Sequence, residues 1–113
     1  MEIEQEKLPD GVTIIRLAGR MDSQGASDID LKFTAYTVRD RGAVIVDMSA
    51  VSFLASIGIR TLILSAKALH VRGGKIALLN PDSDVRKVLE MAGVDSLIPV
   101  CDSMESARSA VVV

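Results

Sequence analysis

The chain has 113 residues, which suits a single domain spanning residues 1–113. Hydrophobic residues make up 49% of it, which excludes disorder, and its 13 basic and 15 acidic residues form no block of either sign, which argues against a nucleic-acid-binding surface. Arg60, Lys67 and Arg72 interrupt the longest apolar stretch, so no membrane span is expected.

The N-terminal half of the chain predicts a hairpin, a helix and a short strand. Residues 2–8 alternate weakly in polarity, and Pro9-Asp10-Gly11 predicts a turn before the β-branched run over 12–17, so these two segments are expected to pair. Apolar side chains at helical spacing predict a helix over about 24–39. The all-apolar run over 44–46 predicts a strand that is covered on both faces, and a short turn is expected between Asp47 and the helix that starts at Ser56.

The C-terminal half alternates helices with strands. Gly73-Gly74 and Gly93 are expected to end helices, since glycine adopts positive φ without a side-chain clash. Pro81-Asp82-Ser83-Asp84 offers helix caps, and Asp102 followed by Glu105 resembles a capping box. The predicted elements are a helix from Ser56 with an apolar stripe over 59–69, a strand over 75–79, a helix over 85–92, a strand over 96–100 and a final helix over about 102–111.

This order of elements predicts an α/β fold with a mixed, mostly parallel sheet. The alternation implies about five strands and about four helices joined by right-handed crossovers, with the first hairpin as the antiparallel part. In such sheets, ligands and partners meet the carboxyl ends of the strands, where helices begin. Asp22 and Ser56 both follow strands, so we expect them at the same end of the sheet.

The sequence offers no catalytic or metal site. Its single His and single Cys cannot form a zinc site, and Cys101 is expected to be a small buried hydrophobe in a cytoplasmic protein without an internal disulfide. His70 would end the helix that Ser56 begins, about 21 Å away, which is too far for a catalytic pair. The glycine motifs of hydrolases and nucleotide-binding proteins are missing too. We therefore expect a protein that is not an enzyme and holds no cofactor.

Ser56 has two compatible interpretations. As an N-cap, its hydroxyl would accept a hydrogen bond from the backbone N–H of Gly58 or Ile59, worth about 1 kcal/mol. As a regulatory site, it would carry a phosphate of about −1.5 to −2 charges, which the free N–H groups and the dipole at a helix start favour. The fold would then stay intact while its surface changes charge, which suits a binding switch.

Residues near Ser56 carry alternatives of their own. Asp22 is either the N-terminal cap of the first helix or part of a surface beside Ser56. Asp47 is either an acid that supports a functional site or the polar end of a strand, and the second interpretation is favoured. Phe53 and Leu54 are expected to fill the core beneath the turn.

Two segments resemble signatures of the STAS domain family, the anti-sigma factor antagonists. Gly19-Arg20-Met21-Asp22 resembles the Gly-x-Leu-Asp signature after the second strand, and the segment from Val46 to Ile59 resembles the family's central signature. The order of elements and Gly73-Gly74-Lys75 before a strand also fit, so the resemblance covers nearly the whole chain. It implies the mixed sheet described above and a phosphorylation site at Ser56.

The resemblance also implies a partner-switching mechanism. The family's serine is phosphorylated by a GHKL-type serine kinase that is often itself the anti-sigma factor. The unphosphorylated antagonist binds that kinase and frees its sigma factor or other target, and a PP2C-type phosphatase restores the antagonist, which catalyses nothing. On this basis the partner-binding surface around Ser56 is expected to include Asp22, Ser23, Ala55, Ile57 and Gly58.

Two residues depart from the family pattern. Many members carry an acid before the serine and a hydroxyl after it, where this chain has Ala55 and Ile57. These departures motivate an alternative function, a non-switching STAS scaffold that uses the same face within a larger signalling, secretion or biofilm regulatory complex.

Overall fold

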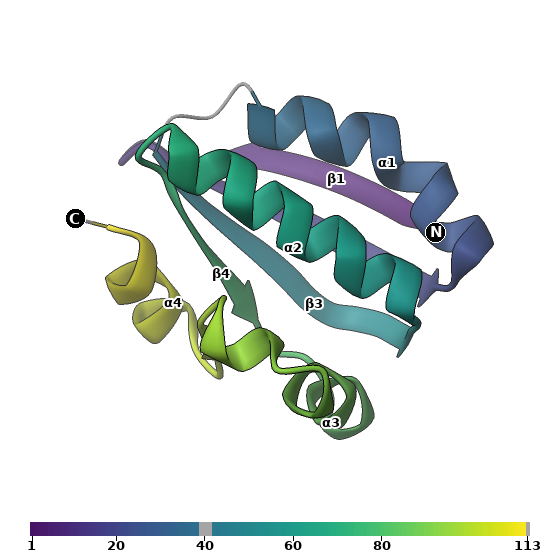
Figure 1. Cartoon of the computed structure of the whole chain (residues 1–113). Helices are drawn as coiled ribbons and strands as arrows, with labels where there is room; N and C mark the ends of the chain where they lie inside the picture. The colour runs from purple at the N-terminus through teal and green to yellow at the C-terminus, as the bar shows by residue number, and fades with distance from the viewer. Residues whose placement is uncertain (39–41, 113) are drawn as a thin grey trace.

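A computed structural model describes residues 1–38 and 42–112 (Figure 1), and within them the chain forms one five-stranded sheet with four α-helices. The strand order is β1-β2-β3-β4-β5, with β1 antiparallel to β2 and the other neighbours parallel. The predicted mixed, mostly parallel α/β fold is therefore confirmed. The elements are β1 (Glu2–Lys7), β2 (Val12–Met21), α1 (Ser23–Val38), β3 (Ala43–Leu54), α2 (Ser56–Val71), β4 (Lys75–Leu79), α3 (Ser83–Met91), the 3-10 helix η1 (Val94–Ser96), β5 (Val100–Cys101) and α4 (Met104–Val111).

The helices divide between the two faces of the sheet. Figure 1 shows α1 and α2 side by side on one face, as expected when successive right-handed crossovers step in the same direction across a sheet. Val44 and Val46 of β3 join the core on that face, which also contains buried residues of α1, α2 and α3. Ile45, between them in β3, points to the opposite core, where Ala107 and Val111 of α4 cover the sheet. Both faces of this part of β3 are therefore buried, as its apolar run predicts.

Strand β3 is much longer than the run over 44–46 predicts, because it extends to Leu54. Beyond Asp47 it keeps pairing with β2, but the register shifts twice, between Arg16 and Ala18 and again between Gly19 and Arg20. Such irregularities break the alternation of buried and exposed side chains that marks a strand in a sequence. The expected turn after Asp47 is therefore wrong.

Asp47 itself lies within β3, so its interpretation as the polar end of a strand is also wrong. Its Oδ1 accepts hydrogen bonds from the backbone N–H of Ser49 at 3.0 Å and from the hydroxyl of Ser49 at 2.7 Å. These short-range bonds satisfy the carboxylate locally, and they give it a role in shaping the strand beside the irregular pairing.

The C-terminal part corrects two further predictions. The strand expected over 96–100 is wrong: the chain first forms η1, and only Val100 and Cys101 pair with β4. The expected capping box at Asp102 is wrong as well, because Ser103 is the N-cap of α4 and its Oγ accepts from the backbone N–H of Ser106 at 3.1 Å. Asp102 instead forms an ion pair with Arg86.

Other local predictions hold, except for the burial of Cys101. Asp82 caps α3 by accepting a hydrogen bond from the backbone N–H of Val85 at 2.9 Å, and Gly73 and Gly93 follow helices with φ of +80° and +75°. Cys101 is half-buried rather than buried. Helix α1 begins at Ser23, and the predicted end of that helix at residue 39 lies outside the described residues.

Candidate partner-binding and phosphorylation site

The carboxyl ends of β2 and β3 bring the two candidate segments together. Met21 and Leu54 are paired in the sheet, and the backbone N–H of Ala55 donates to the carbonyl oxygen of Met21 at 3.0 Å. Because Asp22 follows Met21 and Ser56 follows Ala55, the starts of α1 and α2 are neighbours, as Figure 1 shows. The expectation that Asp22 and Ser56 lie at the same end of the sheet is confirmed.

Ser56 is the first residue of α2 and is exposed, but it is not the cap. The N-cap position belongs to Ala55, whose extended backbone (φ −99°, ψ 170°) leads into the helix and whose side chain makes no cap hydrogen bond. The carbonyl oxygen of Ala55 accepts from the N–H groups of Gly58 at 3.0 Å and Ile59 at 3.2 Å. The expected hydroxyl cap is therefore wrong. Ser56 is instead an exposed residue at the positive end of a 16-residue helix that has no acidic residue in its first turn.

Asp22 is the cap of α1. Its Oδ1 accepts from the backbone N–H of Gly25 at 2.8 Å, and its Oδ2 lies 3.4 Å from Nε of Arg20. The hydrogen bond from Gly25, with a smaller contribution from Arg20, holds the pKa of the Asp22 carboxyl below its usual range. The cap interpretation is thus confirmed. The alternative, that Asp22 belongs to a surface beside Ser56, is compatible with it because the side chain is only half-buried.

Two glycines allow α1 and α2 to begin so close to the strands. A Cβ on Gly25 would lie 1.8 Å from the carbonyl oxygen of Arg20. A Cβ on Gly58 would lie 2.7 Å from Cγ of Met21 and 2.9 Å from Cδ1 of Leu54. Gly58 is buried, so it supports the candidate surface from beneath rather than lining it.

The remaining predicted surface residues lie at the same end of the sheet. Ser23, the first residue of α1, is exposed, and Ala55 is half-buried. Ile57 leaves 42% of its surface exposed, which is unusual for a large apolar side chain beside a core. The geometry therefore places polar and apolar side chains next to the Ser56 hydroxyl.

The structure adds Arg20, Phe53 and Arg60 to this surface. Phe53 is 40% exposed, and the guanidinium carbon of Arg20 lies 4.3 Å from the centroid of its ring, so the expected core position of Phe53 is wrong. Leu54, in contrast, is buried as expected. Arg60 is exposed one helical turn after Ser56. The spacing of Arg60 was readable from the sequence, whereas the irregular pairing of β3 concealed the exposure of Phe53.

The candidate site contains no set of metal-binding side chains. No group of three His, Cys, Asp or Glu residues among residues 1–38 and 42–112 is placed to hold a metal ion. His70 lies in the last turn of α2, at the opposite end of that helix from Ser56, so the two cannot hydrogen-bond. In the same described part of the chain, the α-helices lack the combination of length and apolar character that a bilayer span requires.

Comparison with known proteins identifies the class. The STAS domain family matches residues 5–107. The protein named "Putative anti-sigma factor antagonist BtrV" from Bordetella bronchiseptica is 30% identical over 110 residues, which cover 97% of this chain and 94% of that protein. The chain therefore belongs to the STAS domain family.

Solved structures share the same fold. An anti-sigma factor antagonist from Mycobacterium paratuberculosis superimposes with a TM-score of 0.87 at 24% identity, covering 97% of this chain and 92% of that one. The anti-sigma factor antagonist SpoIIAA in its unphosphorylated form gives a TM-score of 0.77 at 23% identity, covering 96% and 95% of the two chains. SpoIIAA from Bacillus in the phosphorylated form gives 0.70 at 23% identity, covering 96% and 97%.

Proposed function

We propose that this protein is an anti-sigma factor antagonist that changes partners when Ser56 is phosphorylated. In the unphosphorylated state it binds an anti-sigma factor that is also a GHKL-type serine kinase, and this frees the sigma factor or other target. A PP2C-type phosphatase returns the protein to its binding state. The observation that carries the proposal is that Ser56 is exposed at the first position of α2, in a chain related to named antagonists.

The surroundings of Ser56 support a phosphate on this fold. The phosphate would lie at the positive end of α2, with the exposed guanidinium of Arg60 one turn along the helix. SpoIIAA, a protein of the same fold, exists in both phosphorylated and unphosphorylated forms. The proposed modification therefore changes the surface without requiring a different fold.

The apolar side chains next to Ser56 explain how a phosphate would release a partner. Ile57 and Phe53 are 42% and 40% exposed, so a protein that packs against them removes water from Ser56 as well. An uncompensated dianion in such an interface costs several kcal/mol, and about 1.4 kcal/mol already changes affinity tenfold. The protein acts in this scheme as a cytoplasmic binding module and catalyses nothing itself.

The decisive experiment is isothermal titration calorimetry with the cognate kinase and four forms of the protein. Wild type and Ser56→Ala are expected to bind with similar affinity, whereas Ser56→Asp is expected to bind at least about tenfold more weakly. The matched control is Ser83→Asp, which places the same charge at the exposed first residue of α3 and is expected to leave binding unchanged. Equal affinities for Ser56→Ala and Ser56→Asp would rule out the switch.

A second function has one observation in its favour. Ala55 and Ile57 leave Ser56 without the flanking acid and hydroxyl of many relatives, which suits a scaffold that uses this face permanently in a larger complex. Incubation with the kinase and ATP, followed by intact mass measurement, separates the two functions. Stoichiometric addition of one phosphate that disappears in Ser56→Ala would eliminate the scaffold, and no addition under saturating kinase would favour it.

A further inference from the structure

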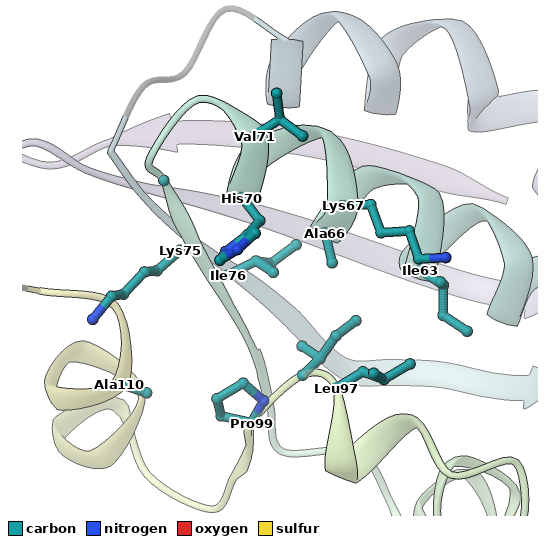
Figure 2. A pocket seen from close by; sticks show the side chains of 12 residues that line it. Ile63, Ala66, Lys67, His70, Val71, Lys75, Ile76, Leu97, Pro99 and Ala110 are labelled. Carbon is teal, nitrogen blue, oxygen red and sulfur yellow. The ribbon is translucent and has the colours of Figure 1, made fainter.

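A large groove lies at the other end of α2, away from Ser56. It has a volume of about 710 Å³ and is bounded by α2, β4, the segment over 97–99 and Ala110 of α4. Figure 2 shows Ala66 and Ile76 in its centre, with Leu97 and Pro99 along the side opposite α2. The groove is therefore mainly apolar and has the size of a small-molecule site.

The titratable side chains around the groove are basic. Of the described residues that line it, the three with titratable side chains are Lys67, His70 and Lys75. Figure 2 shows His70 and Lys75 toward one end, and Lys67 with Ile63 toward the other. None of the three basic groups forms an ion pair with another residue in the described ranges. In a chain with a net charge of −2, Lys67 and Lys75 give this apolar surface a local excess of positive charge.

The groove is open for a structural reason. Strand β5 contributes only two residues to the sheet, and the chain before it forms η1 instead of continuing the strand. The C-terminal half of α2 therefore faces the side chain of Leu97, which is 62% exposed, rather than a fully packed neighbour. This apolar surface remains in contact with water. A ligand that covers it binds favourably, because removing apolar surface from water lowers the free energy.

From these observations we propose that the groove binds a free aliphatic carboxylate, a fatty acid. The carboxylate lies near His70 and Lys75, and the hydrocarbon chain runs over Ile76 toward Ile63 and Leu97. A head of one negative charge complements the basic side chains, and a flexible chain fits the aliphatic lining. Nucleotides fit less well, because the described residues that line the groove include no Phe, Tyr or Trp side chain to stack a base.

The test is a titration of the full chain with dodecanoate below its micellar concentration, followed by calorimetry and by backbone amide NMR shifts. Saturable binding of one molecule is expected, with the largest shifts at Ala66, Gly74 and Ile76. Dodecyltrimethylammonium, which has the same chain length and the opposite charge, is expected not to bind. Shifts centred on Ser56, or equal binding of the cationic detergent, would overturn the proposal.

Variants that change the charge of single residues distinguish binding in the groove from nonspecific electrostatic attraction to the protein surface. Leu97→Glu and Lys75→Glu alter exposed side chains and are expected to weaken dodecanoate binding by about three- to tenfold each. The control Lys32→Glu makes the same charge change as Lys75→Glu, but on α1, which contributes no residue to the groove. Its affinity for dodecanoate should stay within about twofold of the wild-type value. Equal losses of affinity in all three variants would overturn the proposal. So would a parallel titration in which the protein binds anionic phospholipid vesicles but not free dodecanoate.

Discussion

The two ends of α2 differ in how the helix meets the sheet. At the Ser56 end, Gly58 brings the helix against Met21 and Leu54, and side chains fill the space beneath it. At the His70 end, the two-residue β5 leaves a groove of about 710 Å³ beside the same helix. A filled end can act only through its outer surface, which suits a protein partner, whereas an open end can enclose a small ligand. The groove begins at Ile63, about seven helical residues or roughly 10 Å from Ser56, so the two proposed sites use different parts of the helix and can be changed separately.

The largest expected effect breaks the close packing at the Ser56 end. In Gly25→Ala, the new Cβ would meet the carbonyl oxygen of Arg20 at 1.8 Å, and a backbone atom cannot move aside cheaply. The usual gain of about 1 kcal/mol for alanine in a helix is outweighed, and we expect a net loss of about 3 kcal/mol in the free energy of unfolding. Urea denaturation measures it, with the exposed Ser27→Ala as a control near zero. An increase in stability would show that the starts of α1 and α2 are loosely packed.

A smaller effect of the same kind is expected for Gly58→Ala. Here the close atoms belong to the side chains of Met21 and Leu54, which can shift. Movement of these side chains and the higher helix propensity of alanine both reduce the cost of the close contact. We therefore expect the free energy of unfolding to fall by about 1–2 kcal/mol. Arg60→Ala, an exposed change in the same helical turn, is the control in the same denaturation series. Equal stability of the two variants would contradict the tight contact beneath Ser56.

Phosphorylation of Ser56 is expected to stabilise the isolated protein. The helix dipole and an i to i+4 contact with Arg60 should together add about 1 kcal/mol at low salt. Thermal unfolding of the phosphorylated and unmodified forms measures the gain, and Arg60→Ala should remove part of it. Lys67→Ala, nearly two turns further along α2 and facing the groove, should leave it unchanged. A lower melting temperature after phosphorylation would mean that the positive end of α2 does not accommodate the charge.

The smallest expected effect is the pH dependence of the stability that the Asp22 carboxylate contributes. Its folded-state pKa is lowered, first by the hydrogen bond from the N–H of Gly25 and then by Arg20, so its carboxylate contributes stability above the unfolded-state pKa. That contribution is lost as the pH falls through the lower, folded-state pKa. The stability difference between wild type and Asp22→Ala should therefore be constant near neutral pH and narrow below about pH 4. A difference that widens on acidification would contradict the assigned cap.

Much of the architecture was predictable because it depends on short-range patterns. A few neighbouring residues are enough to predict the alternation of strands and helices. The same is true of the helix ends before Gly73 and Gly93 and of the N-cap at Asp82. The position of Ser56 at the start of α2 follows in the same way, from a helical stripe that begins just after it. These predictions needed no knowledge of what lies across the sheet.

The failed predictions depend on partners distant in sequence. Strand β3 extends to Leu54 because β2 lies beside it, and the irregular register between them turns Phe53 toward solvent and Arg20. Ser56 loses the expected cap role because the Met21 carbonyl binds the Ala55 N–H and places Ala55 at the cap position. No local pattern encodes such contacts.

By itself, the sequence determined the class of fold, the order of its elements and the serine at the start of α2, because hydrophobic periodicity and glycine conformation act over a few residues. Only the tertiary structure decided which side chains surround that serine and that a groove opens between α2 and the segment over 97–99. The reason is that strand register and the closing of a cavity depend on how distant segments pack, and many pairings satisfy the same local pattern.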